Sequence, residues 1–319
     1  MNTIWIEKYR PNNLDQIIGQ DKNIKILNRM ISNNSLPHLL FHGKSGTGKT
    51  STILSIANKL YGKNKTFMVI KLDASDDRGI NTVREEIKGF ADKMTPFNNS
   101  IKLIILDEAD SMTYDAQFAL RRIIEKYSDN TRFCLICNYE NKIIPAIKSR
   151  CVNIRFYPID YNTIINRLHY ICQVEKIEYD AESIQAISTI SNGDLRKAIN
   201  MLQSINMSNN KISVDLCYNM AGIPKPTLIH QIFNILIDKN VDFETAYNFM
   251  ISNILDNGIL LSFVLQQLTI YIITQIINKN IIPNISNIIS DIAELECSIA
   301  ISTFTDIYIA GLVSIFKKY

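Results

Sequence analysis

The chain has 319 residues, of which 46% are hydrophobic and 20% charged, and its net charge is +3. This length has room for two or three domains, and the composition is that of ordinary globular proteins. The small net charge excludes a protein coated in positive charge. Any binding of nucleic acid must therefore come from a local basic patch.

The N-terminus lacks the apolar core of a signal peptide, and polar residues interrupt the two apolar stretches at 258–277 and 297–316. Membrane spans usually run about 20 residues almost without strongly polar side chains, so both stretches are predicted to be buried helices. The six cysteines need no disulfide framework. Cys134 and Cys137 form a lone CxxC pair, and a metal site would need a second pair. The favoured interpretation is two small residues on a buried strand.

Short apolar runs alternate with longer amphipathic segments between residues 37 and 156. The runs have the length of strands and cover residues 38–42, 67–72, 102–106, 132–137 and 152–156. Helical patterns lie between them at 49–61, 80–93, 114–127 and 143–148. This alternation predicts an α/β domain whose five-stranded parallel sheet carries helices on both faces.

No further strand is predicted after Pro158. Helical patterns at 161–175, 181–190 and 194–205 predict a small helical domain in which Gly193 separates the last two helices and Asp194 caps the third. Residues 222–226 have the composition of a linker. The remainder is predicted to be helical, at 227–237, 243–254, 260–278, 285–301 and 306–317. The expected domains are therefore residues 1–157, 158–222 and 223–319.

One segment fits the phosphate-binding loop pattern G-x-x-x-x-G-K-[ST] without exception. Its residues are Gly43, Lys44, Ser45, Gly46, Thr47, Gly48, Lys49 and Thr50. A predicted strand precedes the loop and a helix follows it, which is the required context. Glycines let backbone N–H groups turn toward phosphate oxygens, and the helix presents its positive end to the same anion. We expect Lys49 to reach the β- and γ-phosphates of ATP and the Thr50 hydroxyl to bind Mg²⁺.

A second apolar strand ends in Asp107 and Glu108. Asp107 is predicted to hold Mg²⁺ at the carboxyl edge of the sheet, and Glu108 to act as the general base for the attacking water. A solvated strand end is the alternative for this pair taken alone. Asp110 has a possible catalytic role, but the favoured interpretation is a cap of the following helix.

Asn138 follows a third strand and is predicted to bind the γ-phosphate or the water. The carboxyl ends of three predicted strands would then meet at one site. Two arginines, Arg150 and Arg196, are further candidates for stabilising charge on the γ-phosphate. From the residues alone, a surface position remains the alternative for each.

Read together, these motifs resemble the small subunits of replication factor C, the sliding-clamp loader of the AAA+ superfamily. The matching boxes occur in the family's order and spacing across residues 1–205, at residues 5–11, 43–50, 73–79, 106–110, 119–122, 149–151 and 193–196. The C-terminal region matches only loosely. Lys44 and Ser45 stand where the family usually has Pro-Pro, a departure whose effect on affinity or rate has no predicted direction.

The resemblance implies roles that the residues alone do not. Arg150 is implied to be an arginine finger acting on ATP held by the neighbouring subunit, and Arg196 a sensor of γ-phosphate in its own site. Tyr9, Arg10 and Pro11 fall where the family packs beside adenine. The C-terminal helices are implied to form a collar that joins five subunits, with the sliding clamp as a further partner.

The resemblance also implies binding of primer–template DNA, through Arg78, Arg84 and Lys88. Contact with phosphates suits Arg and Lys and needs no base reading. A solvated helix face is the alternative for Arg84 and Lys88. Arg121 and Arg122 are conjectured to report DNA binding to Glu108.

Three hypotheses follow from the sequence. The leading one is a clamp-loader subunit that uses ATP and Mg²⁺. The second is a structural subunit that supplies Arg150 but hydrolyses little ATP, and the third a stand-alone AAA+ helicase or remodeller. The expected location is intracellular: nuclear in a eukaryote, otherwise cytoplasmic or in a viral replication compartment.

Overall fold

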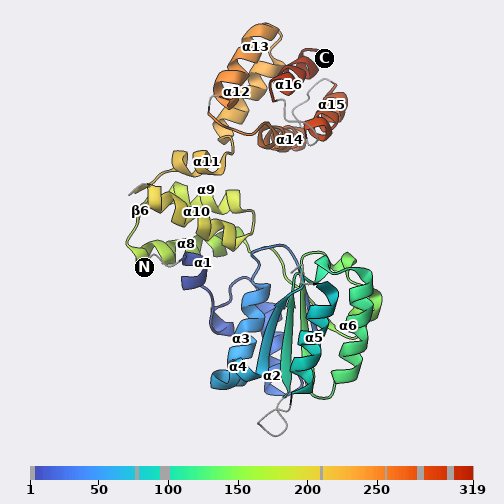
Figure 1. Cartoon of the computed structure of the whole chain (residues 1–319). Helices are drawn as coiled ribbons and strands as arrows, with labels where there is room; N and C mark the ends of the chain where they lie inside the picture. The colour runs from blue at the N-terminus through green and yellow to red at the C-terminus, as the bar shows by residue number, and fades with distance from the viewer. Residues whose placement is uncertain are drawn as a thin grey trace. The chain divides into compact units, whose positions relative to one another are not determined.

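The computed structural model describes residues 4–75, 79–93, 101–208, 211–255, 257–278, 284–299 and 305–318. The chain forms two compact units (Figure 1). The first comprises Met1–Lys176 and Ile187–Ser204, and the second Ile177–Ala186 and Ile205–Tyr319.

The first unit contains the predicted five-stranded parallel sheet. Its strands are β1 (Leu39–His42), β2 (Val69–Asp73), β3 (Lys102–Asp107), β4 (Thr131–Cys137) and β5 (Val152–Arg155). They lie side by side in the order β2-β3-β4-β1-β5, and each neighbouring pair is parallel. The carboxyl ends of β3, β4 and β1 are therefore adjacent along one edge, which is where parallel sheets bind ligands.

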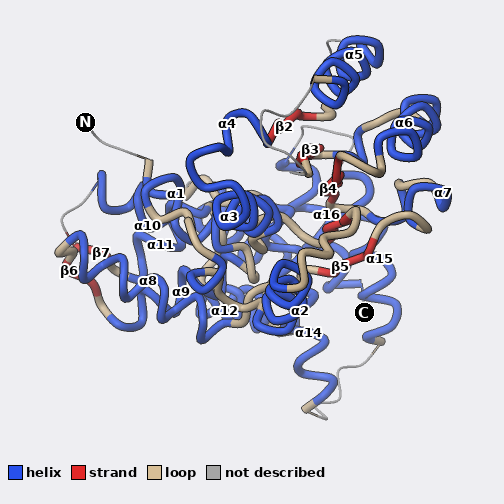
Figure 2. The backbone as a smooth tube through the Cα atoms, turned by 90° about the horizontal axis from the view of Figure 1, so that it is seen from below, coloured by secondary structure: helices blue, strands red, loops and turns tan. Residues whose placement is uncertain are grey.

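Helices cover both faces of the sheet (Figure 2). Residues of α2 and α3 pack on one face, and residues of α5, α6 and α7 on the other. The α-helices up to the end of the sheet are α1 (Trp5–Lys8), α2 (Asp21–Ser32), α3 (Lys49–Tyr61), α4 (Lys65–Met68), α5 (Gly79–Asp92), α6 (Tyr114–Tyr127) and α7 (Pro145–Lys148). Four single 3-10 turns join them: η1 (Leu14–Gln16), η2 (Gly62–Asn64), η3 (Ala109–Ser111) and η4 (Glu140–Lys142).

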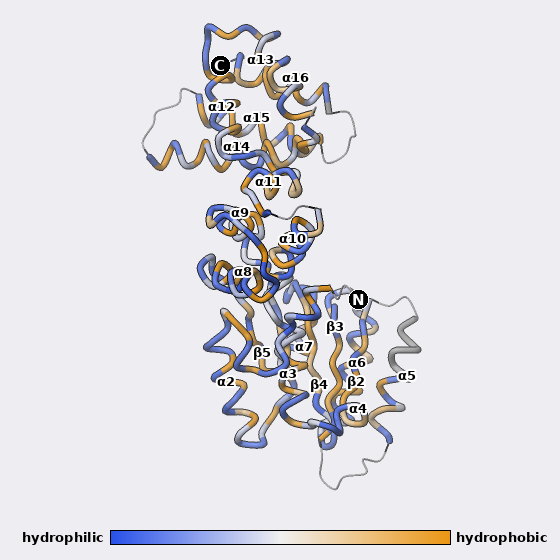
Figure 3. The backbone as a smooth tube through the Cα atoms, turned by 90° about the vertical axis from the view of Figure 1, so that its left-hand side faces the viewer, coloured by the Kyte–Doolittle hydropathy of each residue, from blue (hydrophilic) through white to orange (hydrophobic). Residues whose placement is uncertain are grey.

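Alternation of side chains along each strand explains the two faces. In β4, Cys134 belongs to the core beneath α2 and α3, whereas Phe133 and Cys137 belong to the core beneath α5 and α6. Strands β1, β3 and β4 are accordingly hydrophobic along most of their length (Figure 3). The two thiols of the CxxC pair lie on opposite faces of the sheet, so they do not form a common metal site. All six cysteines are free.

The predicted strand at 67–72 begins too early. Residues Lys65–Met68 form the short helix α4, and β2 runs from Val69 to Asp73. Phe67 is 69% exposed. Its apolar character made it look like part of a buried strand, but only Met68 at the end of α4 enters the core.

The segment after the sheet contains α8 (Tyr161–Glu175), α9 (Ala181–Ser191) and α10 (Leu195–Ser208). The predicted cap of the third helix is confirmed, because Lys197 N donates to Asp194 Oδ1 at 3.0 Å. The prediction that strands end at Pro158 was wrong. Two-residue strands β6 (Glu178–Tyr179) and β7 (Lys211–Ile212) pair in parallel, and they are too short to produce a periodic pattern.

The second unit is otherwise helical, as predicted. Its elements are α11 (Val214–Ala221), α12 (Pro226–Ile237), α13 (Phe243–Met250), the π-helical turn η5 (Ile251–Leu255), α14 (Leu261–Ile277), α15 (Ile285–Ile299) and α16 (Thr305–Lys318). Buried apolar residues from α12 to α16 form one core. Among the described residues, no helix has the length and apolar run needed to cross a bilayer.

Candidate nucleotide-binding site

The loop at residues 43–48 joins β1 to α3 through backbone conformations that favour glycine. Gly43, Gly46 and Gly48 have φ angles of 146°, 67° and 95°. A β-carbon on Gly43 would lie 2.2 Å from the carbonyl oxygen of Phe156, just beyond β5. These glycines therefore allow both the turn and its close packing on the sheet. The result is a loop followed directly by the N-terminus of α3, a favourable position for an anion.

Lys49, the first residue of α3, is buried, and its ammonium group is held in place by three acceptors. Nζ donates to the carbonyl oxygens of Gly43 and Lys44 at 2.7 and 2.8 Å, and to Asn138 Oδ1 at 3.0 Å. Burial lowers the pKa of Lys49, while neighbouring Cys137 and Asp107 act in the opposite direction. The structure thus brings two predicted site residues, Lys49 and Asn138, into contact.

Thr50 and Asp107 meet beside this lysine. Thr50 Oγ1 donates to Asp107 Oδ2 at 3.2 Å, and Lys71 Nζ lies 3.0 Å from the same carboxylate oxygen. A hydroxyl and a carboxylate at this separation are oxygen ligands of the kind that Mg²⁺ prefers, so the residues present fit the metal. Lys71, on β2, is a cation next to that position that sequence reasoning missed.

Glu108 follows β3 in a left-handed conformation with φ of 53°. Such a conformation is unusual for a residue other than glycine. Hydrogen bonds hold it: Glu108 N donates to Asp107 Oδ1 at 3.2 Å, and Ser111 Oγ donates to Glu108 O at 2.7 Å. The side chain is exposed and belongs to the lining of the cavity described below.

Asp110 does not cap the following helix, so that prediction was wrong. The cap of α6 is Thr113, whose side chain accepts from Ala116 N. Asp110 Oδ2 instead accepts from the backbone N–H groups of Asn138 and Tyr139, at 3.2 and 3.1 Å. Asp110 lies within the 3-10 turn at 109–111, before the helix, and its carboxylate is directed toward the end of β4. Asp110 therefore fixes the backbone that carries Asn138.

Most of the residues predicted to form the nucleotide-binding site line one cavity. Its lining includes the loop residues Ser45, Gly46, Thr47, Gly48, Lys49 and Thr50, together with Asp107, Glu108, Asn138, Arg196, Tyr9, Arg10 and Pro11. Gly43 and Lys44 are not among the lining residues, and the side chain of Lys44 is exposed. Their backbone carbonyls nevertheless hold Lys49. Nothing in the described part of the chain explains why lysine replaces the family's usual proline at position 44.

Hydrogen bonds join the N-terminal segment at residues 5–11 to α8. Tyr9 Oη and Lys8 Nζ both donate to Glu175 Oε1, and Arg167 Nη2 donates to Tyr9 O at 2.9 Å. Burial and the hydrogen bond with Glu175 raise the pKa of Tyr9. Arg10 pairs with Glu7 over 2.8 Å. The side of the cavity formed by Tyr9, Arg10 and Pro11 is thus fixed to a helix more than 150 residues away in sequence.

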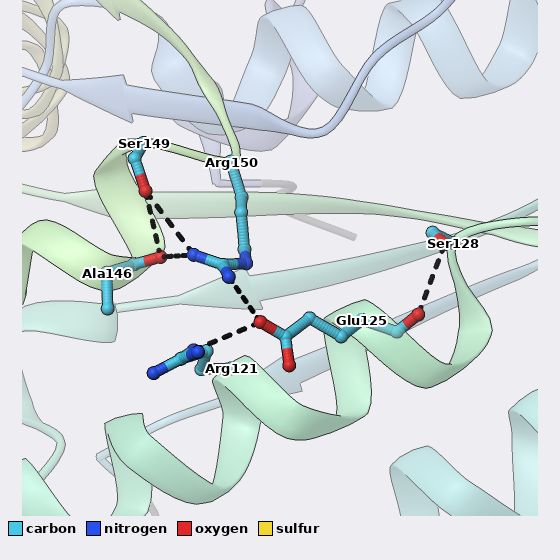
Figure 4. A network of polar contacts seen from close by, with 6 residues as sticks. All are labelled: Arg121, Glu125, Ser128, Ala146, Ser149 and Arg150. Atoms are coloured by element: carbon cyan, nitrogen blue, oxygen red, sulfur yellow. Dashed lines mark hydrogen bonds and ion pairs between the residues drawn. The ribbon is translucent and has the colours of Figure 1, made fainter.

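The two candidate arginines have different surroundings. Arg196, in the first turn of α10, lines the cavity and is close enough to Lys49 to lower the pKa of that lysine. Arg150, after α7, is absent from the lining and pairs with Glu125 of α6 (Figure 4). The structure therefore places Arg196, but not Arg150, at the chain's own site.

The residues expected to contact DNA are only partly described. Arg78 lies outside the described residues, and the side chain of Arg84 also lies outside them. Lys88 is half-buried on α5. Sequence reasoning missed Lys102, whose buried Nζ donates to the carbonyl oxygens of Phe90, Ala91 and Lys93 at the end of α5. Lys102 thereby fixes the C-terminus of that helix.

Sequence reasoning also missed Gln20, which contacts the phosphate-binding loop. Gln20 is 3% exposed, and its amide donates to Tyr157 O at 2.7 Å and Thr47 O at 3.4 Å. The remaining lining of the cavity consists of Ser51, Cys137 and seven apolar residues: Ile6, Ile17, Ile18, Ile136, Ile159, Leu195 and Ile199. Apolar residues carry no chemical signature, so only the folded chain identifies them as neighbours of the cavity.

Comparisons with known proteins agree with this geometry. The model of the ATPase family associated with various cellular activities matches residues 39–159, and that of the RCF1/5-like AAA+ ATPase lid domain matches residues 166–207. A RuvB motor from Thermotoga maritima has a similar structure, with a TM-score of 0.54 and 16% identity over 80% of this chain and 91% of that one. That likeness shows the fold alone.

Replication factor C subunits of several organisms are similar to this chain over most of its length. Probable replication factor C subunit 5 of Dictyostelium discoideum is 43% identical over 98% of this chain and 90% of its own length. Replication factor C subunit 5 of Homo sapiens is 40% identical over 99% and 92%. Subunit 3 of Saccharomyces cerevisiae is 44% identical over 77% and 73%. The chain therefore belongs to the replication factor C small subunits, a family of AAA+ ATPases.

Proposed function

We propose that this chain works within a multisubunit clamp loader, where it binds ATP with Mg²⁺ and uses its hydrolysis to load a sliding clamp onto primer–template DNA. ATP binding would assemble the open-clamp, DNA-binding state, and hydrolysis would release the loaded clamp. The observation that supports this best is the meeting of Lys49, Thr50, Asp107 and Asn138 at the ends of three adjacent strands.

Binding of the triphosphate follows from the loop. Backbone N–H groups of residues 46–50 and the N-terminus of α3 provide donors for phosphate oxygens. Lys49 is already desolvated, and it can exchange its contact with Asn138 for a phosphate oxygen while keeping the two carbonyls. Tyr9, Arg10 and Pro11 would pack beside the adenine. Mg²⁺ held at Thr50 and Asp107 would neutralise charge on the phosphates.

Hydrolysis requires a base and a means of orienting the water. Glu108 lies on the cavity wall one residue after Asp107, and its carboxylate would take the proton from the attacking water. Asn138, fixed by Asp110, would orient that water or the γ-phosphate. Arg196 would contact the γ-phosphate from α10. Each of these groups comes from a different element of the first unit.

Arg150 would act on the neighbouring subunit's ATP. Its absence from the chain's own cavity supports a role in trans, because a guanidinium stabilises phosphoryl transfer only by direct contact. Each site in the assembly would then need two chains. A subunit that only supplied Arg150 would not need the Lys49, Asp107, Glu108 and Asn138 set that this chain carries.

Other parts of the chain would join the subunits and bind DNA. We propose three domains, residues 1–157, 158–222 and 223–319, with the last joining subunits through its helices. Arg78, Arg84 and Lys88 would contact phosphates of primer–template DNA inside the assembly. The expected location is the intracellular compartment in which DNA is replicated.

The direct test is transfer of a labelled sliding clamp to primed DNA by the complex of this chain with its partner subunits. We expect loading to require ATP, Mg²⁺ and the primer–template junction, and to be lost with Asp107→Asn. Loading at the wild-type rate by a complex that lacks this chain would contradict the proposal. ATP-driven DNA unwinding by the lone chain would instead favour a helicase.

A further inference from the structure

Arg150 contacts three residues of its own subunit, one of which is Ser149, whose Oγ accepts from Nη1 at 3.4 Å. Nη1 donates to the carbonyl oxygen of Ala146 in α7 at 2.7 Å, and Nη2 contacts Glu125 Oε1 on α6 (Figure 4). The side chains of Arg150 and Glu125 are 32% and 40% exposed. The guanidinium is therefore accessible, but two different elements fix its direction.

Glu125 has a second cationic partner. Arg121, one turn earlier on α6, donates Nε–H to the same Oε1 at 3.1 Å. The hydrogen bond with Arg121, and the charges of Arg121 and Arg150, lower the pKa of Glu125. The carboxylate is thus ionised at neutral pH, and Arg121 stabilises its rotamer in the orientation that meets Arg150.

The cluster of Arg121, Glu125 and Arg150 keeps an attraction for phosphate. Two guanidinium groups and one carboxylate sum to one positive charge. A guanidinium has five N–H donors, and the contacts with Ala146, Ser149 and Glu125 use at most three of them. Arg150 can therefore keep these contacts and still donate to a phosphate of another chain.

We infer that Glu125 is a positioning residue for Arg150, which it holds ready for the triphosphate of the neighbouring subunit. This inference rests on the proposed action of Arg150 in trans. A long arginine side chain loses rotamer freedom when it binds, and contacts that fix it beforehand remove part of that loss. In this role Glu125 would act only through Arg150.

The expected effect is moderate, because exposed ion pairs contribute little individually. Glu125→Ala in the assembled complex should lower the Arg150-dependent part of kcat roughly three- to tenfold. That part is the difference between the wild-type complex and the Arg150→Ala complex at saturating clamp and primed DNA. KM for ATP in this chain's own site should stay within about twofold, since Glu125 is outside that cavity. Glu125→Gln should recover part of the loss, because its amide oxygen still accepts from Arg150.

The test is a double-mutant cycle with Glu125→Ala, Arg150→Ala and both together. Asp129→Ala is the control, since it removes one exposed carboxylate just after α6 with the same change in net charge. We expect the double variant to match Arg150→Ala, and Asp129→Ala to match wild type. Equal melting temperatures of the complexes show that folding and assembly are intact.

Each other outcome has a distinct meaning. If Arg150→Ala lowers turnover but Glu125→Ala does not, or if the two losses add, the positioning role is wrong and the trans role of Arg150 stands. If Glu125→Ala raises turnover, Glu125 restrains the arginine and the inference is overturned. If Arg150→Ala keeps the wild-type rate, the trans role itself is wrong and the inference falls with it.

Discussion

Gly46 of the phosphate-binding loop lies directly against Asp194, the cap of α10. A β-carbon on Gly46 would come within 1.7 Å of Asp194 Oδ1, the atom that accepts from Lys197 N. The residue that begins the helix of Arg196 is therefore in contact with the loop that would hold the phosphates. Any change in the loop at Gly46 must also move this cap.

Gly46→Ala should weaken ATP binding about tenfold or more, because it adds a clash with Asp194 to the cost of a positive φ, which is roughly 1–2 kcal/mol for alanine. Gly62→Ala is the matched control. Gly62 also has a positive φ, of 49°, but a β-carbon added there would meet nothing within 4 Å. Titration with a fluorescent ATP analogue, alongside thermal unfolding, separates strain from the clash. Equal ATP affinities in the two variants would contradict the role of the Asp194 contact.

Glu108→Gln should keep ATP binding and lose hydrolysis by a factor of about 10² to 10⁴, the usual contribution of a general base. The amide preserves the size of the side chain, and the left-handed backbone at this position is held by main-chain contacts that the substitution leaves in place. Single-turnover hydrolysis in the assembled complex measures the effect. Wild-type hydrolysis by this variant, with the other subunits' sites disabled, would remove Glu108 from the mechanism.

Asp110→Ala should lower kcat roughly tenfold with little change in ATP affinity, because the N–H groups of Asn138 and Tyr139 lose their acceptor. Asp110→Asn keeps an acceptor oxygen and should be milder. Steady-state ATPase of the two variants in the complex makes the comparison. If Asp110→Asn is as damaging as Asp110→Ala, the charge of Asp110 matters and not the placement of Asn138.

His38 makes stability depend on pH. Its Nδ1 accepts from Phe133 N at 3.2 Å, and burial, with a contribution from Arg132, lowers its pKa to about 4 from 6.5. Between these values the unfolded chain takes up a proton that the folded chain does not, so stability should fall as pH drops from about 6.5 toward 4. His38→Gln should reduce this fall in urea unfolding. Identical pH profiles for His38→Gln and wild type would refute the assignment.

Much of the first unit could be predicted because its chemistry leaves a local pattern. The strands are apolar runs. Asp107 ends one of them, and Lys49, Thr50 and Asn138 follow others at recognisable positions. Partnerships between distant residues leave no such pattern. The contact of Tyr9 with Glu175 joins residues 166 positions apart. The role of Asp110 depends on a 3-10 turn that could not be predicted from the sequence.

Arg150 shows the same limit. Its proposed role in trans follows from its box of residues, but its contact with Glu125 depends on how α6 and α7 pack. Likewise, Lys102 begins a strand as the sequence predicts, but the contacts of its ammonium group with the end of α5 could not be predicted. Side-chain direction, not residue type, was the missing information.

We propose that this chain contributes to two ATP sites, its own through Lys49 and a neighbour's through Arg150. The most direct measurement is ATP turnover with clamp and primed DNA by complexes carrying Lys49→Ala or Arg150→Ala in this chain alone, each with the number of bound ATP molecules. We predict that Lys49→Ala removes one bound ATP, and that Arg150→Ala retains all of them while turnover falls. Full turnover by the isolated chain, unchanged by partners, clamp or DNA, would contradict the proposed contribution to two ATP sites.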